Sequence, residues 1–198
     1  MNGFDRILSS MKAMIEELYG EVNDEDGIYR TMVHHIGVSD MNAILEVLPE
    51  GGFNKERPYP ILHFHLTLAV NVPEEYEAEL CLSLNRLNNA ISVGDFPSFG
   101  CFAYHPGLRQ IYLTYRLPIN PDDPDNETVN IRYYLGVLYE ELDALGDYIL
   151  FLCNNEGKSP ILDEYLRYLK NIDDWNDIDR RSEELSDLLR EFERENDK

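Results

Sequence analysis

Basic residues are scarce in this chain. Its 198 residues contain 17 Lys and Arg against 38 Asp and Glu, so the formal net charge is -21 at pH 7. A surface with this charge repels phosphate groups, which argues against nucleic-acid and anionic-membrane partners. The same charge favours a basic polypeptide as a partner, although a surface that only keeps the protein solvated is the more common reason for such acidity.

Cysteine is also rare, and its spacing is irregular. Cys81, Cys101 and Cys153 lie far apart, each within an apolar run, and no two of them form a CxxC pair. An odd number of distant cysteines excludes a regular disulfide framework and the usual zinc-binding spacings. We therefore expect buried, reduced thiols in a cytoplasmic protein.

Long hydrophobic runs are missing. No stretch approaches the roughly 18 consecutive apolar residues of a membrane-spanning helix. Residues 1–20 contain three acidic side chains and lack the basic start and continuous apolar core of a signal peptide. These absences again predict a cytoplasmic protein without a membrane partner.

The motifs of common enzyme classes are absent as well. The sequence contains no GxSxG, phosphate-loop or GxGxxG pattern. The acidic clusters at residues 122–125 and 173–179 lack the glycine and the final glutamate of a calcium-binding loop. We therefore expect a protein without catalytic residues and without a bound cofactor.

A hairpin at residues 96–119 is the clearest β-sheet signal that is present. Two aromatic and β-branched runs flank Pro106-Gly107, a strong turn signal because glycine tolerates positive φ. In the second run Ile111, Leu113, Tyr115 and Leu117 alternate with Tyr112, Thr114 and Arg116. This period of two predicts a strand with one buried and one outward face.

Helical spacing of apolar residues predicts the remaining architecture. The expected helices span residues 3–19, 73–93 and 131–152, with shorter ones near 161–169 and 178–192. Further strands are expected at residues 28–37, 42–48 and 60–70, and residues 23–27 read as a turn. The simplest arrangement is an α+β fold with a five-stranded antiparallel sheet and helices packed on one face. Residues 1–156 would form this domain, and residues 157–198 a C-terminal acidic helical extension.

His63 and His65 are the most plausible metal ligands in the sequence. They are two residues apart on a predicted strand, so both imidazoles project from the same face. No acid or cysteine lies beside them at ligand spacing, and stacked or solvent-exposed histidines are the commoner outcome on such a face. His34 and His35 are adjacent, so on a regular strand they would point to opposite faces.

The outward face of the predicted hairpin offers a possible binding surface. Tyr112, Thr114 and Arg116 share this face, with Tyr104 expected alongside them. An extended peptide or a second copy of the chain would fit such a surface. Ordinary packing between neighbouring strands is the alternative that the sequence leaves open.

Part of the chain resembles a known protein family. The helix sequence Leu84-Asn85-Arg86-Leu87-Asn88, the run from Phe99 to Tyr104 and the strand from Leu108 to Leu117 are similar to the YbjN-like family. Its members are bacterial proteins described as sensory transduction regulators, with the fold of type III secretion chaperones. The resemblance implies a chaperone-like fold and homodimerisation, and it implies no catalytic residues. It does not extend beyond Ser159.

Three functions are compatible with these observations. The first is a non-catalytic protein-binding module, chaperone-like or regulatory, which binds a polypeptide partner or itself as a homodimer; the acidic surface would suit a basic polypeptide. The second is a metal-dependent enzyme or metal-binding protein centred on His63 and His65. The third is an acidic immunity-type protein that neutralises a basic toxin.

Overall fold

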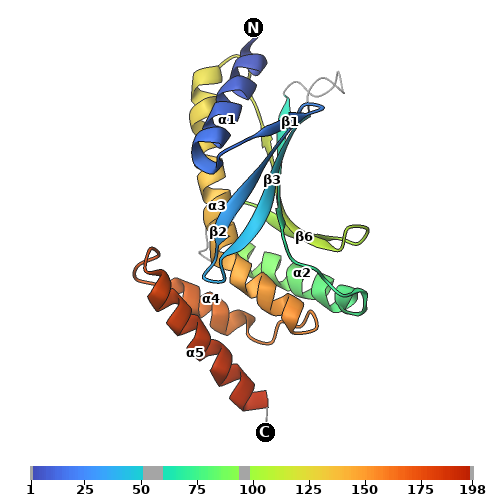
Figure 1. The fold of residues 1–198 in the computed structure, drawn as a ribbon, viewed down its shortest axis with the longest axis vertical. Helices are drawn as coiled ribbons and strands as arrows, with labels where there is room; N and C mark the ends of the chain where they lie inside the picture. Colours follow the sequence, from blue (N-terminus) through green and yellow to red (C-terminus); the bar gives the residue numbers. More distant parts are fainter. Residues whose placement is uncertain (1, 51–59, 94–98, 197–198) are drawn as a thin grey trace.

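The computed structural model describes residues 2–50, 60–93 and 99–196, and Figure 1 shows their arrangement. Within these residues the fold is α+β, with five α-helices and an open antiparallel sheet of six strands in the order β1-β2-β3-β4-β6-β5. The helices are α1 (Gly3–Tyr19), α2 (Glu77–Val93), α3 (Pro124–Asn154), α4 (Leu162–Lys170) and α5 (Ile178–Asn196), and a 3-10 turn, η1 (Glu74–Tyr76), precedes α2. The strands are β1 (Asn23–Glu25), β2 (Ile28–Ile36), β3 (Met41–Glu50), β4 (Ile61–Leu68), β5 (Cys101–His105) and β6 (Gln110–Pro118).

The expected number of strands is wrong by one. Residues 23–25 form the edge strand β1, which pairs with residues 28–30 of β2. All three residues of β1 are exposed, so no apolar alternation marks the strand. The sequence does contain a signal for the hairpin turn between β1 and β2, the dipeptide Asp26-Gly27. Both residues have positive φ in the structure, 56° and 77°, as a two-residue hairpin turn requires. The first residues of the predicted hairpin, 96–98, lie outside the described part of the chain.

The apolar periodicities correctly located the helices that form the core. α1 begins with a capping box in which Asn2 and Asp5 bond each other's backbone amides, and it packs along α3. The buried stripe of α3 contains Ile131, Leu135, Leu138, Leu142, Leu145, Ile149 and Leu152. Burying each such side chain contributes about 1.5–3 kcal/mol relative to leaving it in water.

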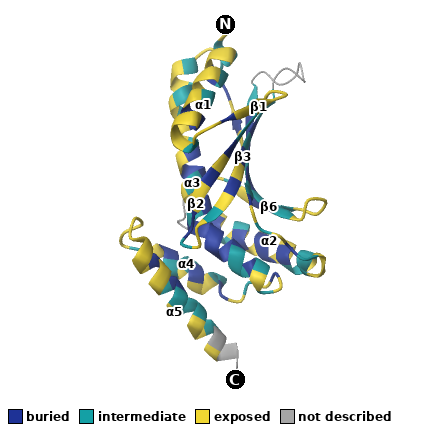
Figure 2. Ribbon diagram, in the orientation of Figure 1, coloured by how far each residue is buried: buried dark blue, intermediate teal, exposed yellow. Residues whose placement is uncertain are grey.

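One face of the sheet is buried against these helices. Val33, Leu45, Phe64, Phe102 and Leu113 lie on this face and are at most 2% exposed. Figure 2 shows the buried residues gathered where the sheet meets α3, with exposed residues on the outside of α1 and α5. The opposite face, called the outer face below, is therefore the one that is available for contacts.

A β-bulge interrupts the pairing of β2 with β3. Val33 pairs with Ala43 but Ile36 pairs with Met41, so β2 contains one extra residue at this point. His35 takes a positive φ of 60° there. As a result His34 and His35 are both exposed, with ring centroids 6.1 Å apart, instead of pointing to opposite faces.

The hydrophobic core continues beyond residue 157 into the C-terminal helices. Ile161, Tyr165 and Leu169 are buried in the same core as α3, and the Tyr165 hydroxyl donates a hydrogen bond to the Ala144 carbonyl at 2.8 Å. Gly157, where the sequence placed the boundary, packs against α2 so closely that an added Cβ would lie 2.6 Å from the backbone nitrogen of Leu80. None of the described helices is long and apolar enough to span a lipid bilayer.

All three cysteines are free thiols, but the expectation that they are buried is wrong for two of them. Cys81 and Cys101 are exposed, on α2 and at the start of β5, and Cys153 is half-buried. Burial raises the pKa of the Cys153 thiol to about 11. This thiol is therefore protonated at neutral pH, which disfavours a nucleophilic role.

Candidate outer-face site

The outer face is built from two rows of side chains that cross five strands. The strand register places one residue of each strand in line with the next. The first row is Met32, Ile44, Thr67, Tyr112 and Ala103, and the second is Arg30, Glu46, His65, Thr114 and Cys101. Met32 and Ile44 are 41% and 38% exposed, so the first row presents apolar side chains to solvent.

Three of the four predicted surface residues lie together on the outer face, and Tyr104 does not. Tyr112, Thr114 and Arg116 alternate with buried residues of β6 as expected. Tyr104 pairs with Ile111, which is fully buried, so it lies on the opposite face of the sheet. The length of the turn between β5 and β6 sets this register, and the sequence pattern of β5 alone does not determine it.

His63 and His65 also lie on the outer face, on β4. Their rings lie close together, with centroids 4.0 Å apart and planes tilted by 49°, and His65 in turn lies 5.3 Å from the ring of Tyr112. His63 is buried, at 9% exposure, and its Nε2 contacts the Thr114 hydroxyl of β6 at 2.8 Å. Histidines on such a face were expected to be stacked or exposed to solvent; the two rings are in contact but tilted, and His63 is buried.

The surroundings of the two imidazoles favour their neutral forms. Burial lowers the pKa of both, and the positive charge of Arg116 lowers the pKa of His63 further. A charge on His63 also lowers the pKa of His65, because two imidazolium rings at this separation repel each other. The carboxylate of Glu50 opposes these effects.

Glu50 is the acidic neighbour that the sequence pattern did not reveal. Its Oε1 lies 3.3 Å from Nδ1 of His63 and 3.5 Å from the Arg116 guanidinium. Glu50 is on β3, so only the pairing of strands brings it beside His63. Even so, across residues 2–50, 60–93 and 99–196 no three His, Cys, Asp or Glu side chains form a group that fits a metal ion. The geometry is therefore that of a hydrogen-bonded histidine pair.

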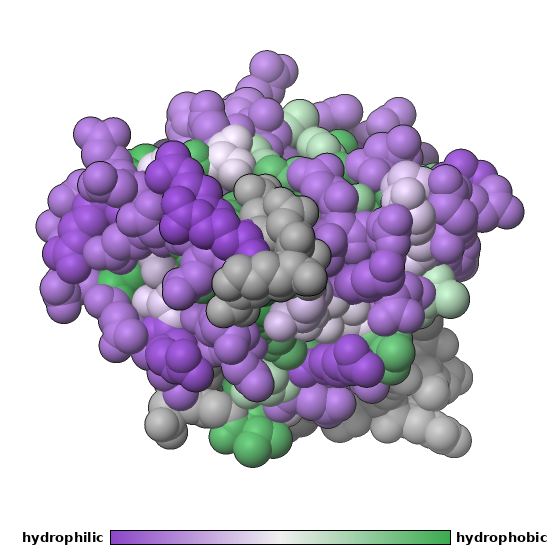
Figure 3. Space-filling model, turned by 90° about the horizontal axis from the view of Figure 1, so that it is seen from below, coloured by the Kyte–Doolittle hydropathy of each residue, from purple (hydrophilic) through white to green (hydrophobic). Residues whose placement is uncertain are grey.

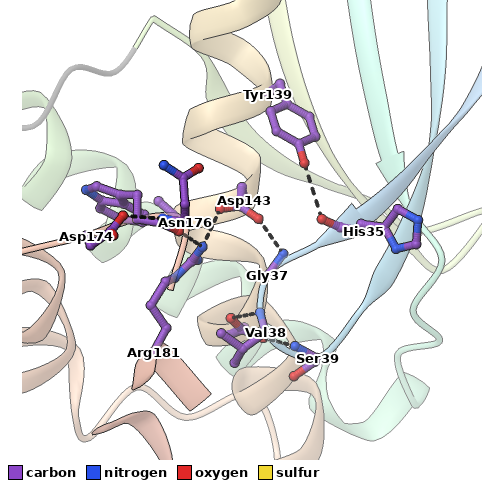
Figure 4. Close-up of polar contacts among 12 residues, drawn as sticks. His35, Gly37, Val38, Ser39, Tyr139, Asp143, Asp174, Asn176 and Arg181 are labelled. Carbon is purple, nitrogen blue, oxygen red and sulfur yellow. Dashed lines mark hydrogen bonds and ion pairs between the residues drawn. The ribbon is translucent and has the colours of Figure 1, made fainter. Parts of the chain in front are cut away.

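A second polar cluster, drawn in Figure 4, joins α3, α5 and the turn between β2 and β3. Asp143 accepts a hydrogen bond from the Gly37 amide at 2.8 Å and pairs with Arg181 of α5 at 3.0 Å. Asp147 accepts from the amides of Val38 and Ser39 at 2.9 and 3.0 Å. Asp147 is buried and Asp143 is half-buried, and both carboxylates take the place of water as acceptors for backbone amides that strand pairing leaves free.

The basic residue of this cluster is almost fully buried. Arg181 is 3% exposed, donates to the Trp175 carbonyl at 3.1 Å and lies 4.8 Å from the Trp175 ring centroid. Tyr168 of α4 donates to the Arg181 carbonyl. All of these partners come from the protein itself, so the cluster holds the C-terminal helices in place.

Comparisons of the chain with protein-family models, with curated proteins and with solved structures returned no match.

Proposed function

We propose that this protein is a non-catalytic binding module that takes an extended, basic polypeptide segment of another protein across its outer face. The proposal rests on the apolar row that crosses five strands. A sheet face that only contacts water is typically polar throughout, whereas this row exposes Met32 and Ile44 and continues through Tyr112. An extended segment lying across it would place alternate side chains on the row.

Charge supports a basic segment as the occupant. The carboxylates of the outer face are already paired, Glu46 with Arg30 and Glu50 with Arg116, so the centre of the face is close to neutral. The rest of the molecule supplies the excess of 21 negative charges. Figure 3 shows hydrophilic side chains over most of the face seen from below, with isolated hydrophobic ones between them. Such a field attracts cationic chains over distances up to the Debye length of about 8 Å at physiological salt.

A homodimer, which the resemblance to YbjN-like proteins implies, is the competing occupant of this face. Two copies of the chain carry the same net charge of -21 and repel each other at long range. The chaperone-like or regulatory role is part of the same proposal, because both roles need a bound polypeptide and no chemistry.

Site-specific photo-crosslinking in the native host tests the proposal. A photoreactive amino acid replaces Ile44 or Tyr112 on the outer face, and Tyr133 of α3, which is 59% exposed, serves as the matched control position. We expect adducts with one or a few Lys- and Arg-rich proteins from positions 44 and 112 and none from position 133. Adducts of twice the mass of the chain would establish the homodimer instead. Equal labelling from all three positions would refute the outer face as a binding site.

A further inference from the structure

A hollow of about 600 Å³ lies at the free edge of β2, away from the centre of the outer face. The end of α1 contributes Leu18 and Tyr19, β2 contributes Met32 and His34, and α3 contributes Arg132 and Tyr139. Leu18 and Met32 are 44% and 41% exposed, so their apolar surface is available to a ligand. The volume is within the range of about 300–1,000 Å³ that small-molecule sites occupy.

A glycine in the middle of α3 opens this hollow. Gly136 lines it, and a Cβ built at Gly136 would meet no atom within 4 Å. Glycine inside a helix costs about 1 kcal/mol relative to alanine. Gly146 of the same helix is different, because an added Cβ would lie 2.8 Å from Met41 and 2.9 Å from Ile36. Packing against neighbours therefore explains Gly146, whereas Gly136 leaves free space.

The lining of the hollow differs in charge from the rest of the molecule. None of its lining residues is acidic, although the chain contains 38 Asp and Glu, and Arg132 is the lining residue with a permanent charge; the nearby carboxylates of Glu17 and Asp40 contact Arg132 and His35 from outside the lining. Burial raises the pKa of the Tyr19 phenol to about 12 and also raises the pKa of Tyr139, so neither adds a negative charge at neutral pH. The hollow therefore favours an anion.

Arg132 is placed to meet that anion. Its Nη2 contacts the Glu17 carboxylate at 2.7 Å, but the two side chains are 52% and 64% exposed. Exposed ion pairs of this kind contribute only about 0–1 kcal/mol, so a ligand carboxylate competes with Glu17 at little cost. The guanidinium also has further N–H groups for a second hydrogen bond.

We propose that this hollow binds a small, free aromatic carboxylic acid. The apolar body packs against Leu18, Met32 and Tyr19, in the space that Gly136 leaves, and the carboxylate pairs with Arg132. The site shares Met32 with the outer face but depends on Leu18, Arg132 and Gly136 of α1 and α3 and not on Tyr112 or Ile44, so either proposal can fail without the other.

Calorimetric titration with 2-naphthoate tests this site, with 2-naphthamide as the neutral probe of the same shape. The wild-type chain is expected to bind the acid up to about fivefold more tightly than the amide, because only the acid forms the charge-assisted pair with the exposed Arg132. Arg132→Gln removes that preference. Gly136→Leu places a side chain in the space where the aromatic ring would pack and should weaken binding of both probes, and a Cβ at this position meets no neighbouring atom.

Arg6→Gln is the matched control, because Arg6 is as exposed as Arg132 and also forms an ion pair, with Asp125, outside the hollow. It is expected to bind 2-naphthoate like the wild type. The site is refuted if the wild-type chain binds no 2-naphthoate at millimolar concentration, if acid and amide bind equally, or if Gly136→Leu binds as the wild type does. Circular dichroism of each variant establishes that it is folded.

Discussion

His63 and His65 lie ring to ring on β4, with Nδ1 of His63 3.3 Å from Nε2 of His65. In the folded chain burial lowers the pKa of both imidazoles below the ordinary value of 6.5, and Arg116 lowers that of His63 further. In the unfolded chain both side chains titrate near that ordinary value. Below about pH 6.5 the unfolded state therefore binds more protons than the folded state.

Acidification is accordingly expected to destabilise the fold through this pair. The stability that the neutral pair contributes is complete above about pH 6.5 and is lost as the pH falls from there through the lowered folded-state pKa. Urea unfolding between about pH 7.5 and pH 5 measures the effect. The double variant H63Q/H65Q should lose less stability over this range than the wild type, while His34→Gln, a change to an exposed imidazole of β2, should behave as the wild type. Equal losses in all three proteins would contradict the prediction.

Asp147→Asn is expected to destabilise the turn between β2 and β3. The two carboxylate oxygens of Asp147 accept from two backbone amides, those of Val38 and Ser39. An asparagine side chain turns one acceptor into a donor that faces an N–H group, which costs about 1–3 kcal/mol. Chemical denaturation measures the loss, and hydrogen exchange should show faster exchange at Val38 and Ser39. Asp163→Asn, at an exposed position of α4, is the control and should leave both unchanged.

Arg181→Met is expected to loosen α5 while the sheet stays folded. The change removes the ion pair with Asp143 and leaves that carboxylate without its buried counter-charge, for which the typical cost is about 3–5 kcal/mol. Hydrogen exchange should accelerate along α5 more than in β3 and β4. Adding Asp143→Asn removes the uncompensated charge and should recover part of the lost stability. The side-chain amide oxygen that this change introduces can still accept the hydrogen bond from the Gly37 amide. Failure of the second change to recover stability would mean that lost packing, not charge, is responsible.

Two glycines of α3 are expected to respond oppositely to alanine. Gly136→Ala should stabilise the protein by up to about 1 kcal/mol, because alanine favours the helix and its Cβ meets no neighbour. Gly146→Ala gains the same helix propensity but forces Met41 and Ile36 apart, at a typical cost of about 1–3 kcal/mol. Thermal unfolding of the two variants measures the difference. Equal effects would show that the space around Gly136 is already filled by neighbouring side chains.

The sequence predicted the parts of the fold that depend on local periodicity. The apolar stripes of α1 and α3 and the alternation along β6 follow from spacings of three to four and of two, which a single segment displays. β1 was missed because a three-residue edge strand has no buried side chain to mark it. At the turn between β5 and β6 the sequence pattern predicted positive φ at Gly107, but the residue with positive φ, 54°, is Arg109.

The candidate sites needed information that no single segment contains. Glu50 comes next to His63 through the register of β3 and β4, and Tyr104 lies on the buried face through the register of β5 and β6. Asp147 and the amides of Val38 and Ser39 are more than 100 residues apart in sequence. Acidic residues are so frequent in this chain that composition alone does not distinguish a buried carboxylate from a solvated one.

The bulge in β2 means that one residue decides the chemistry at the rim of the hollow. Without that additional position, Val33 and Ile36 would not both reach the interior, and His34 and His35 would diverge across the strand. Insertion or deletion of a single codon here would therefore exchange an imidazole for an aliphatic group at the surface. Relatives that differ in length at this strand would be expected to differ in what they bind before they differ in how they fold.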